Sequence, residues 1–337
     1  MAEEDTQAAR LHKDAIVIDG CSFFSKGWHE RLEVSGVTAL QMTVPWPWDD
    51  ARTAIRRYSE YYAIVRDEPR LNIVLTADDI KRNKAEGRVG FILGCQNAQI
   101  LEDDPSLVEV FARLGVRVIQ LAYNSRNLLA DGCLESNDAG LSRLGRTMIQ
   151  EMNRHGIQVD LSHTGERSSR EAIELSEKPC IISHANPRTR SENPRNISDD
   201  LIKACAEAGG VIGVTPYAPI NWTGGDAPPT LQDVVDHAEY LADLVGAEHI
   251  SFGTDSEATP GAYPAAVTNH LSSSFPEPTA SFRAKHPGLR KTVGFESMEN
   301  LPEFTAALLA RGWSEDDVRG VLGLNLLRVY GQNWGAA

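Results

Sequence analysis

The sequence contains no long apolar run, no signal-peptide pattern and no paired-cysteine motif. No window reaches the roughly 20 apolar residues that a membrane-spanning helix needs, and the opening stretch MAEEDTQAARLHKDA is acidic and lacks an apolar segment. The five cysteines are dispersed and have no CxxC spacing, which argues against a disulfide framework and for a reducing compartment. We therefore expect a cytoplasmic protein with no membrane partner.

Basic residues are scarce relative to acidic ones. The chain carries 33 Lys and Arg against 47 Asp and Glu, which gives a formal net charge of −14. A chain of this charge repels the phosphate backbone, so no nucleic-acid partner is expected. The acidic residues are scattered and form no blocks, so an ordinary solvated surface accounts for them.

Glycine-rich nucleotide motifs are absent as well. No GxGxxG or P-loop follows any apolar run, which removes the usual reason to expect a doubly wound open sheet. Eight β-branched runs instead alternate with amphipathic stretches, at 15–20, 37–44, 89–97, 116–124, 157–163, 180–184, 210–217 and 249–255. This alternation predicts an α/β fold, a TIM-like (β/α)8 barrel formed by one domain over residues 1–337.

Two further segments complete the prediction of the fold. Helical patterns at ARTAIRRYSEYYAIVRD and SEDDVRGVLGLNLLRVY are expected to form extra peripheral helices around the barrel. The stretch SSSFPEPTASFRAKHPG, residues 272–288, is the most loop-like part of the chain. We expect it to be a long insertion near the functional site.

Polar side chains follow these otherwise apolar runs, where a barrel of this kind carries its active site. Two of the runs end in Ser-His, at His163 and at His184, and the last ends in Asp255. A single histidine at a strand end is more often structural, but two on successive strands with a carboxylate favour a metal site. Imidazole and carboxylate groups are zinc ligands, and a catalytic zinc keeps one position open for water.

Several stretches of the chain resemble the membrane (renal) dipeptidase family. They are GLSRLGRTMIQEMNRHGIQVDLSH, ISHANPRTRSENPRNISDD, AGGVIGV and FGTD. That family consists of zinc-dependent (β/α)8 peptidases of the amidohydrolase group, and the similarity runs from AIVIDG to the C-terminal helices. The resemblance implies a dipeptidase-like hydrolase, a zinc cofactor and a homodimer.

The resemblance also assigns roles to individual residues. His163 and His184 match the two histidine ligands of one zinc ion. Asp255 matches the carboxylate that binds the other zinc ion and handles the proton of the attacking water. Arg195, in NPRN, matches the arginine that binds the carboxylate of the substrate, a task that suits its planar bidentate guanidinium.

The chain departs from the family pattern in one half of the metal site. The family's His-x-Asp on the first strand is replaced by Cys21 and Phe23, its bridging glutamate by Gln96, and its carbonyl-polarising histidine by Tyr123. A neutral amide cannot hold two dications together against their repulsion, so a binuclear centre is not expected.

The remaining residues predict a mononuclear site, with zinc as the metal that the resemblance implies. His163, His184 and Gln96 are the predicted ligands, and Asp255 or water completes the set. A metal-free protein is the alternative. A thiolate ligand from Cys21 is a weaker alternative to a buried, inert thiol.

Three functions are compatible with these residues. The first is metal-dependent hydrolysis of a small carboxylate-bearing amide, such as a dipeptide or N-acyl amino acid, with Asp255 as general base and Tyr123 binding the substrate and donating to the oxyanion. The second is acid–base catalysis by an isomerase or lyase, with a histidine as acid or base. The third is non-catalytic binding of a small molecule. Additional residues expected to line the pocket are Cys21, Asn97 and Tyr217.

Overall fold

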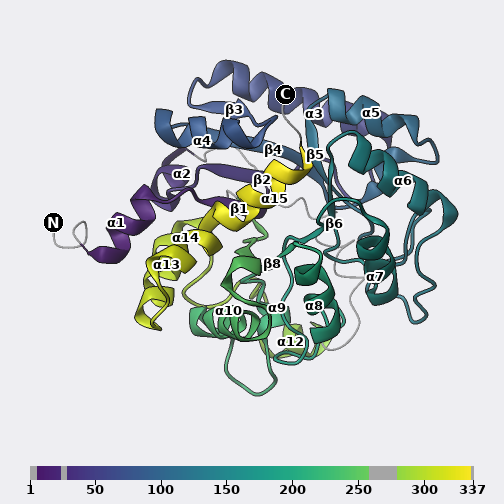
Figure 1. Ribbon diagram of the computed structural model, residues 1–337. Helices are drawn as coiled ribbons and strands as arrows, with labels where there is room; N and C mark the ends of the chain where they lie inside the picture. The colour runs from purple at the N-terminus through teal and green to yellow at the C-terminus, as the bar shows by residue number, and fades with distance from the viewer. Residues whose placement is uncertain (1–5, 24–28, 258–278, 335–337) are drawn as a thin grey trace.

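Eight parallel strands form a nearly closed barrel in the computed structural model, which describes residues 6–23, 29–257 and 279–334 (Figure 1). The strands of the whole sheet are β1 (Ile18–Phe23), β2 (Ala39–Thr43), β3 (Leu71–Ile73), β4 (Val89–Cys95), β5 (Val116–Gln120), β6 (Gln158–Asp160), β7 (Ile181–Ile182), β8 (Val211–Val214), β9 (Ile250–Phe252) and β10 (Ser256–Glu257). The order is β10-β1-β2-β4-β5-β6-β7-β8-β9, and β3 pairs with β4. The predicted barrel is confirmed, with each of the eight predicted runs contributing one strand.

Two short strands were not predicted. Strand β3 adds to the outside of β4, and β10 continues directly from β9 to pair with β1, placing Ser22 opposite Ser256. At three and two residues, both lie below the length at which an apolar pattern is recognisable. Strand β10 therefore supplies the closure between the last and the first strand.

Helices cover the outside of the sheet in Figure 1. The α-helices are α1 (Gln7–Asp14), α2 (His29–Ser35), α3 (Ala51–Asp67), α4 (Ala77–Glu86), α5 (Ser106–Arg113), α6 (Arg143–Arg154), α7 (Glu166–Leu175), α8 (Asp199–Glu207), α9 (Ala218–Asn221), α10 (Leu231–Val245), α12 (Thr279–Lys285), α13 (Leu301–Ala310), α14 (Glu315–Arg319) and α15 (Asn325–Asn333). Shorter turns of helix are η1 (Ala98–Leu101), η2 (Ala247–His249), η3 (Met298–Asn300) and η4 (Gly320–Leu324). No helix within the described ranges is long and apolar enough to cross a bilayer.

Helix α15 differs from its predicted place. It packs across one end of the barrel, where Leu326 and Tyr330 join a buried cluster with inward-facing strand residues such as Ile92. The Tyr330 hydroxyl donates to Oε1 of Gln41 on β2, 2.8 Å away. Helix α15 closes the end of the barrel at which the strands begin. The opposite end, where the strands stop, stays open for functional groups.

The segment 272–288 also differs from its prediction as a loop. Residues 272–278 lie outside the described residues, but helix α12 begins at Thr279 and ends at Lys285. Phe282 of this helix is fully buried and contacts the ring of Trp222 edge-on, with 5.7 Å between the ring centroids. One buried aromatic side chain is therefore enough to anchor a helix in a stretch rich in turn residues.

Close packing between neighbouring strands gives a stability prediction at Gly213 of β8. A Cβ atom there would lie 2.0 Å from the backbone oxygen of Ser183. We expect Gly213→Ala to lower the free energy of unfolding by about 3 kcal/mol or more, because the backbone of a barrel strand cannot move aside. Gly331→Ala, in α15, is the matched control, since its Cβ would meet nothing closer than 3.8 Å. It should stabilise by up to about 1 kcal/mol through helix propensity. Equal denaturant midpoints for the two variants would contradict this.

Candidate metal and active site

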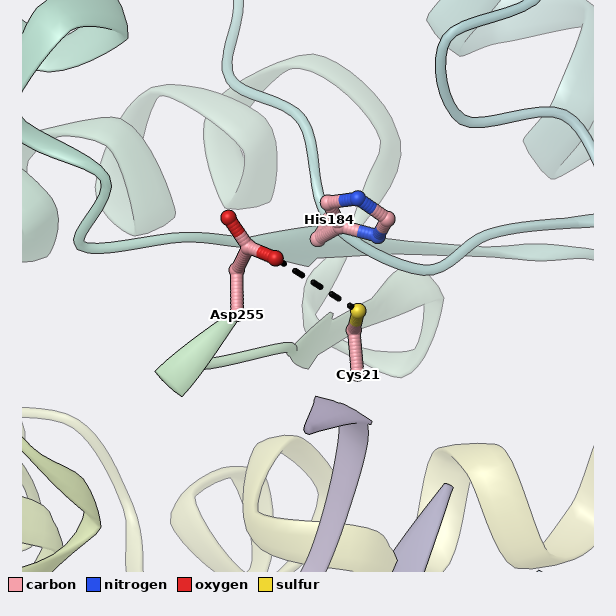
Figure 2. A group of neighbouring side chains, drawn as sticks. All are labelled: Cys21, His184 and Asp255. Carbon is pink, nitrogen blue, oxygen red and sulfur yellow. Dashed lines mark hydrogen bonds between the residues drawn. The ribbon is translucent and has the colours of Figure 1, made fainter. Parts of the chain in front are cut away.

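The predicted site residues lie together at the ends of the parallel strands. Cys21 lies on β1, and Gln96, Tyr123, His163, His184, Tyr217 and Asp255 follow β4, β5, β6, β7, β8 and β9. Figure 2 shows the side chains of Cys21, His184 and Asp255 pointing toward one another, and their ligand atoms all lie within 4.8 Å of each other. These residues are far apart in the sequence, so the barrel is what assembles the group.

Backbone strain is concentrated at this end of the barrel. Asn124, His163 and Asp255 have positive φ angles of 62°, 62° and 49°. A residue with a Cβ atom adopts this left-handed region at a cost of order 1–3 kcal/mol, which persists only where the surroundings enforce it. The strain turns the chain sharply out of each strand and aims these side chains across the barrel mouth.

The two histidines face each other through the same ring atom. Nε2 of His163 lies 3.0 Å from Nε2 of His184, and both rings are buried. The other nitrogen of His163, Nδ1, lies 2.7 Å from Oδ1 of Asn124. Because a carbonyl oxygen only accepts, Nδ1 of His163 carries the proton and Nε2 holds a bare lone pair.

His184 is set in the same tautomer by a different relay. Its Nδ1 lies 2.7 Å from Oγ of Ser183, and that hydroxyl donates to Oδ2 of Asp160 at 2.6 Å. Since the only hydroxyl hydrogen of Ser183 is used in the hydrogen bond to Asp160, Ser183 Oγ can only accept a hydrogen bond from Nδ1–H of His184. Nε2 of His184 is therefore bare as well.

Two bare nitrogen lone pairs at 3.0 Å repel each other unless a cation lies between them. Zinc binds imidazole nitrogen at about 2.0–2.1 Å, and two such bonds span this separation. Groups that orient the far nitrogen of a metal-ligating histidine are the usual outer partners of such sites. The histidine pair therefore fits one metal ion.

Two equivalent carboxylate clamps support the strand ends. Oδ1 of Asp160 accepts backbone N–H groups from Ser162 and Ser183, at 3.0 and 3.1 Å. Oδ1 of Asp19 accepts those of Cys21 and Thr254 in the same pattern, at 3.2 and 2.8 Å. Burial raises the pKa of both carboxyl groups, that of Asp19 to about 6, while these hydrogen bonds oppose the rise.

Cys21 lies in the other half of the site with Gln96 and Asp255. The amide Nε2 of Gln96 donates to Sγ of Cys21 at 2.9 Å, and the thiol donates to Oδ1 of Asp255 at 3.8 Å. Burial, followed by the charge of Asp255, raises the pKa of the Cys21 thiol well above its usual value. A dication held by Cys21 would oppose this shift, because a metal ion favours the thiolate form of a coordinating thiol.

Arg195 acts electrostatically on both histidines. Burial and then Arg195 lower the pKa of both His163 and His184 well below the usual value. Nη2 of Arg195 donates to the backbone oxygen of His184 at 2.6 Å, while its buried Nη1 has no partner within the described part of the chain. Arg195 thus keeps a buried donor available for an anionic group.

The remaining predicted residues lie around this centre. The ring of Tyr123 stacks on that of His163, with centroids 4.3 Å apart, and burial raises the pKa of its hydroxyl. Tyr217 lies under the ammonium of Lys291, 5.8 Å from its ring centroid. Asn97 donates to the backbone oxygen of Pro47 at 2.6 Å and is part of the wall of the site.

Sequence reasoning missed Asn124, Asp160, Ser183 and Lys291. Lys291 donates to the backbone oxygens of Thr254 and Asp255, at 2.8 and 2.5 Å, and so fixes the strained turn. The clamps have a sequence signal, an apolar run followed by Asp-x-Cys in VIDGC and by Asp-x-Ser in VDLSH. Lys291 has none, because it comes from a loop.

The fold and the side chains at its open end are those of an amidohydrolase-type barrel. An amidohydrolase from Pseudomonas aeruginosa superposes with a TM-score of 0.89 at 35% identity, covering 98% of this chain and 100% of that one. A model of the membrane dipeptidase family (peptidase family M19) matches residues 2–270 and 286–335. The chain belongs to this family, as its resemblance predicted.

Curated relatives carry the name of dipeptidases. Dipeptidase verJ of Clonostachys rogersoniana is 31% identical over 283 residues, which is 83% of this chain and 62% of that protein. Dipeptidase tcpJ of Claviceps purpurea is 28% identical over 279 residues, 82% of this chain and 57% of that protein. The chain thus spans about three fifths of the length of these relatives. A metallo peptidase from Rhodobacter sphaeroides, liganded with a phosphinate mimic of the dipeptide L-Ala-D-Ala, shares the fold, with a TM-score of 0.77 at 19% identity over 95% of this chain and 100% of that one.

Proposed function

We propose that the chain hydrolyses the amide bond of a small carboxylate-bearing substrate, a dipeptide or an N-acyl amino acid, with one zinc ion held by His163 and His184. The observation that carries this proposal is the pair of bare Nε2 atoms 3.0 Å apart. Membership of the membrane dipeptidase family supports it. The ligand atoms of Cys21, His184 and Asp255 lie within 4.8 Å of one another, so Cys21 and Asp255 are candidates for further ligands beside His184. The ligand role of Gln96 stays a prediction.

When bound, the metal ion supplies Lewis acidity and lowers the pKa of a bound water. Three side chains of the protein would then have separate roles. Asp255 accepts the proton of the attacking water, and the neutral Tyr123 hydroxyl donates a hydrogen bond to the carbonyl oxygen as negative charge develops there. The free Nη1 of Arg195 binds the carboxylate of the substrate.

Metal-free acid–base catalysis is supported less well. That function needs an imidazole that titrates near neutral pH. Burial and Arg195 instead lower the pKa of both histidines well below this range. Homodimer formation and a cytoplasmic location stay predictions, the first of which light scattering on the purified protein tests.

Elemental mass spectrometry of protein purified without chelators, together with an amide hydrolysis screen, tests the proposal. We expect one zinc ion per chain and activity that chelation removes and zinc restores. Metal-free protein that is folded and inactive on every amide, with zinc added, would overturn it. Two ions per chain would contradict the mononuclear centre.

The carboxylate anchor gives a separate prediction. In Arg195→Lys the ammonium cannot hold the His184 oxygen and a substrate carboxylate in the bidentate manner. We expect KM for an N-acyl amino acid to rise roughly 10–100-fold, the loss of one charged hydrogen bond, with kcat changed much less. The carboxamide of the same substrate is the control, and its kcat/KM should be insensitive to the variant. A wild-type protein that hydrolyses acid and carboxamide equally well has no carboxylate anchor.

A further inference from the structure

Two cavities border the stacked pair of Tyr123 and His163, one of them lined by His163 and the other by Tyr123. The Arg195 cavity, of about 280 Å³, is lined by residues that include His163 and Arg195. The second, which we call the Trp48 cavity, has a volume of about 590 Å³ and is lined by residues that include Tyr123, Trp48 and Leu128. Because the rings of Tyr123 and His163 are in contact, this pair is the shared border of the two cavities, and a substrate that occupies both has to lie across it.

Large apolar side chains are exposed in the Trp48 cavity. Trp48 is 40% exposed and Leu128 is 56% exposed, although both line the same hollow. Exposed apolar groups that gather in a concave site next to catalytic groups mark a place where apolar ligand surface is buried. Because Tyr123 lines the Trp48 cavity, we infer that the cavity is occupied by a part of the substrate.

The aromatic wall of this cavity is held in place. Trp48 stacks on Trp46 with 5.9 Å between ring centroids, and Trp46 stacks on Phe23 at 6.4 Å. Asp49 accepts the backbone N–H of Trp46 at 2.7 Å and pairs with Arg57, whose guanidinium lies over the Trp46 ring. The wall is therefore pre-organised, which limits the entropy lost when a ligand binds.

The Trp48 cavity offers no counter-charge for a cation among the described residues that line it. Its one charged member, Arg126, is itself cationic and pairs with Asp131. The amide of Asn127 donates to Oδ1 of Asn97 and to the backbone oxygen of Leu121, both at 2.7 Å. A free α-amino group would meet no carboxylate in this lining and would lie near the cationic Arg126, so an uncharged group is favoured here.

Resting on the proposed function, we propose that the Trp48 cavity receives an uncharged apolar acyl group, so that the preferred substrates are N-acyl amino acids and not dipeptides with a free ammonium. The carboxylate of the amino acid binds Arg195, and the scissile amide lies beside Tyr123 and His163. Water adds to the carbonyl carbon and the C–N bond breaks. The acyl group keeps the water oxygen and is released as a carboxylic acid, and a proton from the water goes to the nitrogen, which is released as the free amine of the amino acid.

A pair of substrates that differ only in the ammonium tests this inference. N-(3-phenylpropanoyl)-alanine is Phe-Ala without its α-amino group, and both alanine stereoisomers should be assayed. We expect kcat/KM for the acyl compound to exceed that for Phe-Ala by roughly 100-fold, because both place the same phenyl group on the wall but only Phe-Ala must desolvate an ammonium without a counter-charge. Equal values, or a preference for Phe-Ala, would overturn the inference while leaving amide hydrolysis intact.

Variants of the wall locate the effect. We expect Trp48→Ala to lower the ratio of kcat/KM for N-(3-phenylpropanoyl)-alanine to that for N-acetyl-alanine by roughly 10-fold or more, as expected for lost aromatic burial. Leu128→Ala should lower the same ratio by a smaller factor. Leu75→Ala is the matched control, since Leu75 is 42% exposed but does not line this cavity, and its ratio should be unchanged. An unchanged ratio in Trp48→Ala contradicts the inference.

Binding of the non-hydrolysable sulfonamide N-(2-phenylethylsulfonyl)-alanine separates this inference from the proposed function. Calorimetry should show binding that Trp48→Ala weakens roughly 10-fold and Leu75→Ala leaves unchanged. If that pattern holds while no amide is hydrolysed, the Trp48 cavity is supported and hydrolysis fails. If binding is independent of Trp48, the cavity assignment fails whatever the enzyme hydrolyses.

Discussion

Replacing His184 with alanine is expected to remove the metal ion and to lower amide hydrolysis by roughly 10³-fold or more. The imidazole lies 3.0 Å from that of His163 and within 4.8 Å of the Cys21 and Asp255 ligand atoms, so it belongs to every ligand set the structure offers. Without it, His163 remains with Cys21 and Asp255 as the other candidate ligands, and this smaller set holds a dication less tightly. Metal content and kcat/KM, measured on protein whose circular dichroism matches the wild type, check this.

His155→Ala is the matched control for that experiment. His155 lies at the end of α6, half-buried and near Glu151 of the same helix. Its loss should leave both metal content and activity unchanged. A folded His184→Ala protein that keeps its metal ion and its activity would place the metal centre elsewhere and contradict the proposed function.

Asp160→Asn is expected to weaken zinc binding by roughly 10–100-fold, although Asp160 touches no metal ligand directly. In the wild type, the Asp160 carboxylate accepts a hydrogen bond from the Ser183 hydroxyl. The Ser183 oxygen therefore accepts a hydrogen bond from Nδ1 of His184. The new amide must keep its oxygen toward the N–H groups of Ser162 and Ser183, so its NH2 faces the Ser183 hydroxyl. Ser183 then donates to His184 Nδ1, and the ring proton moves to Nε2, where the metal should bind.

Asp19→Asn provides the matched comparison for this tautomer exchange. Asp19 accepts two backbone N–H groups and the hydroxyl of Thr254 in the same arrangement, without a histidine attached. Any general cost of a buried amide is therefore present in both variants, and only Asp160→Asn should change the tautomer. Long-range ¹H–¹⁵N spectra of labelled histidine in metal-free protein report the tautomer directly. Equal zinc affinities for Asp160→Asn and wild type would show that the relay does not matter.

The barrel and the convergence of the histidines were predictable from the sequence because both depend on simple patterns. Buried parallel strands require apolar β-branched runs, and parallel strands put their ends on one face. The extents of the strands were less predictable. The run 157–163 gives a strand of only three residues, β6, which ends at Asp160, and the chain turns out of the sheet by His163, where φ is 62°. Strand β7 stops at Ile182 because the next N–H, that of Ser183, bonds to the Asp160 side chain.

The supporting parts of the site depend on contacts between distant segments, which a single sequence does not display. The relay through Ser183 and the bond from Lys291 to the Asp255 turn are examples. The placement of α15 is another, since its apolar pattern fits the outside of a barrel as well as its end. Patterns indicate that a face is buried, but they do not indicate what buries it.

The closure of the sheet by β10 has a consequence for synthesis of the protein. Cys21 and Asp255 are 234 residues apart and meet only when β10 pairs with β1. At roughly 5–20 residues per second, the ribosome takes on the order of 10–50 s to make that length of chain. During this time one edge of β1 has no partner strand. The pairing of β1 with β10 joins distant parts of the chain, and pairings of this kind also form slowly. His163 and His184 follow neighbouring strands made within a few seconds of each other, so a nascent chain can bring these two histidines together well before β10 pairs with β1.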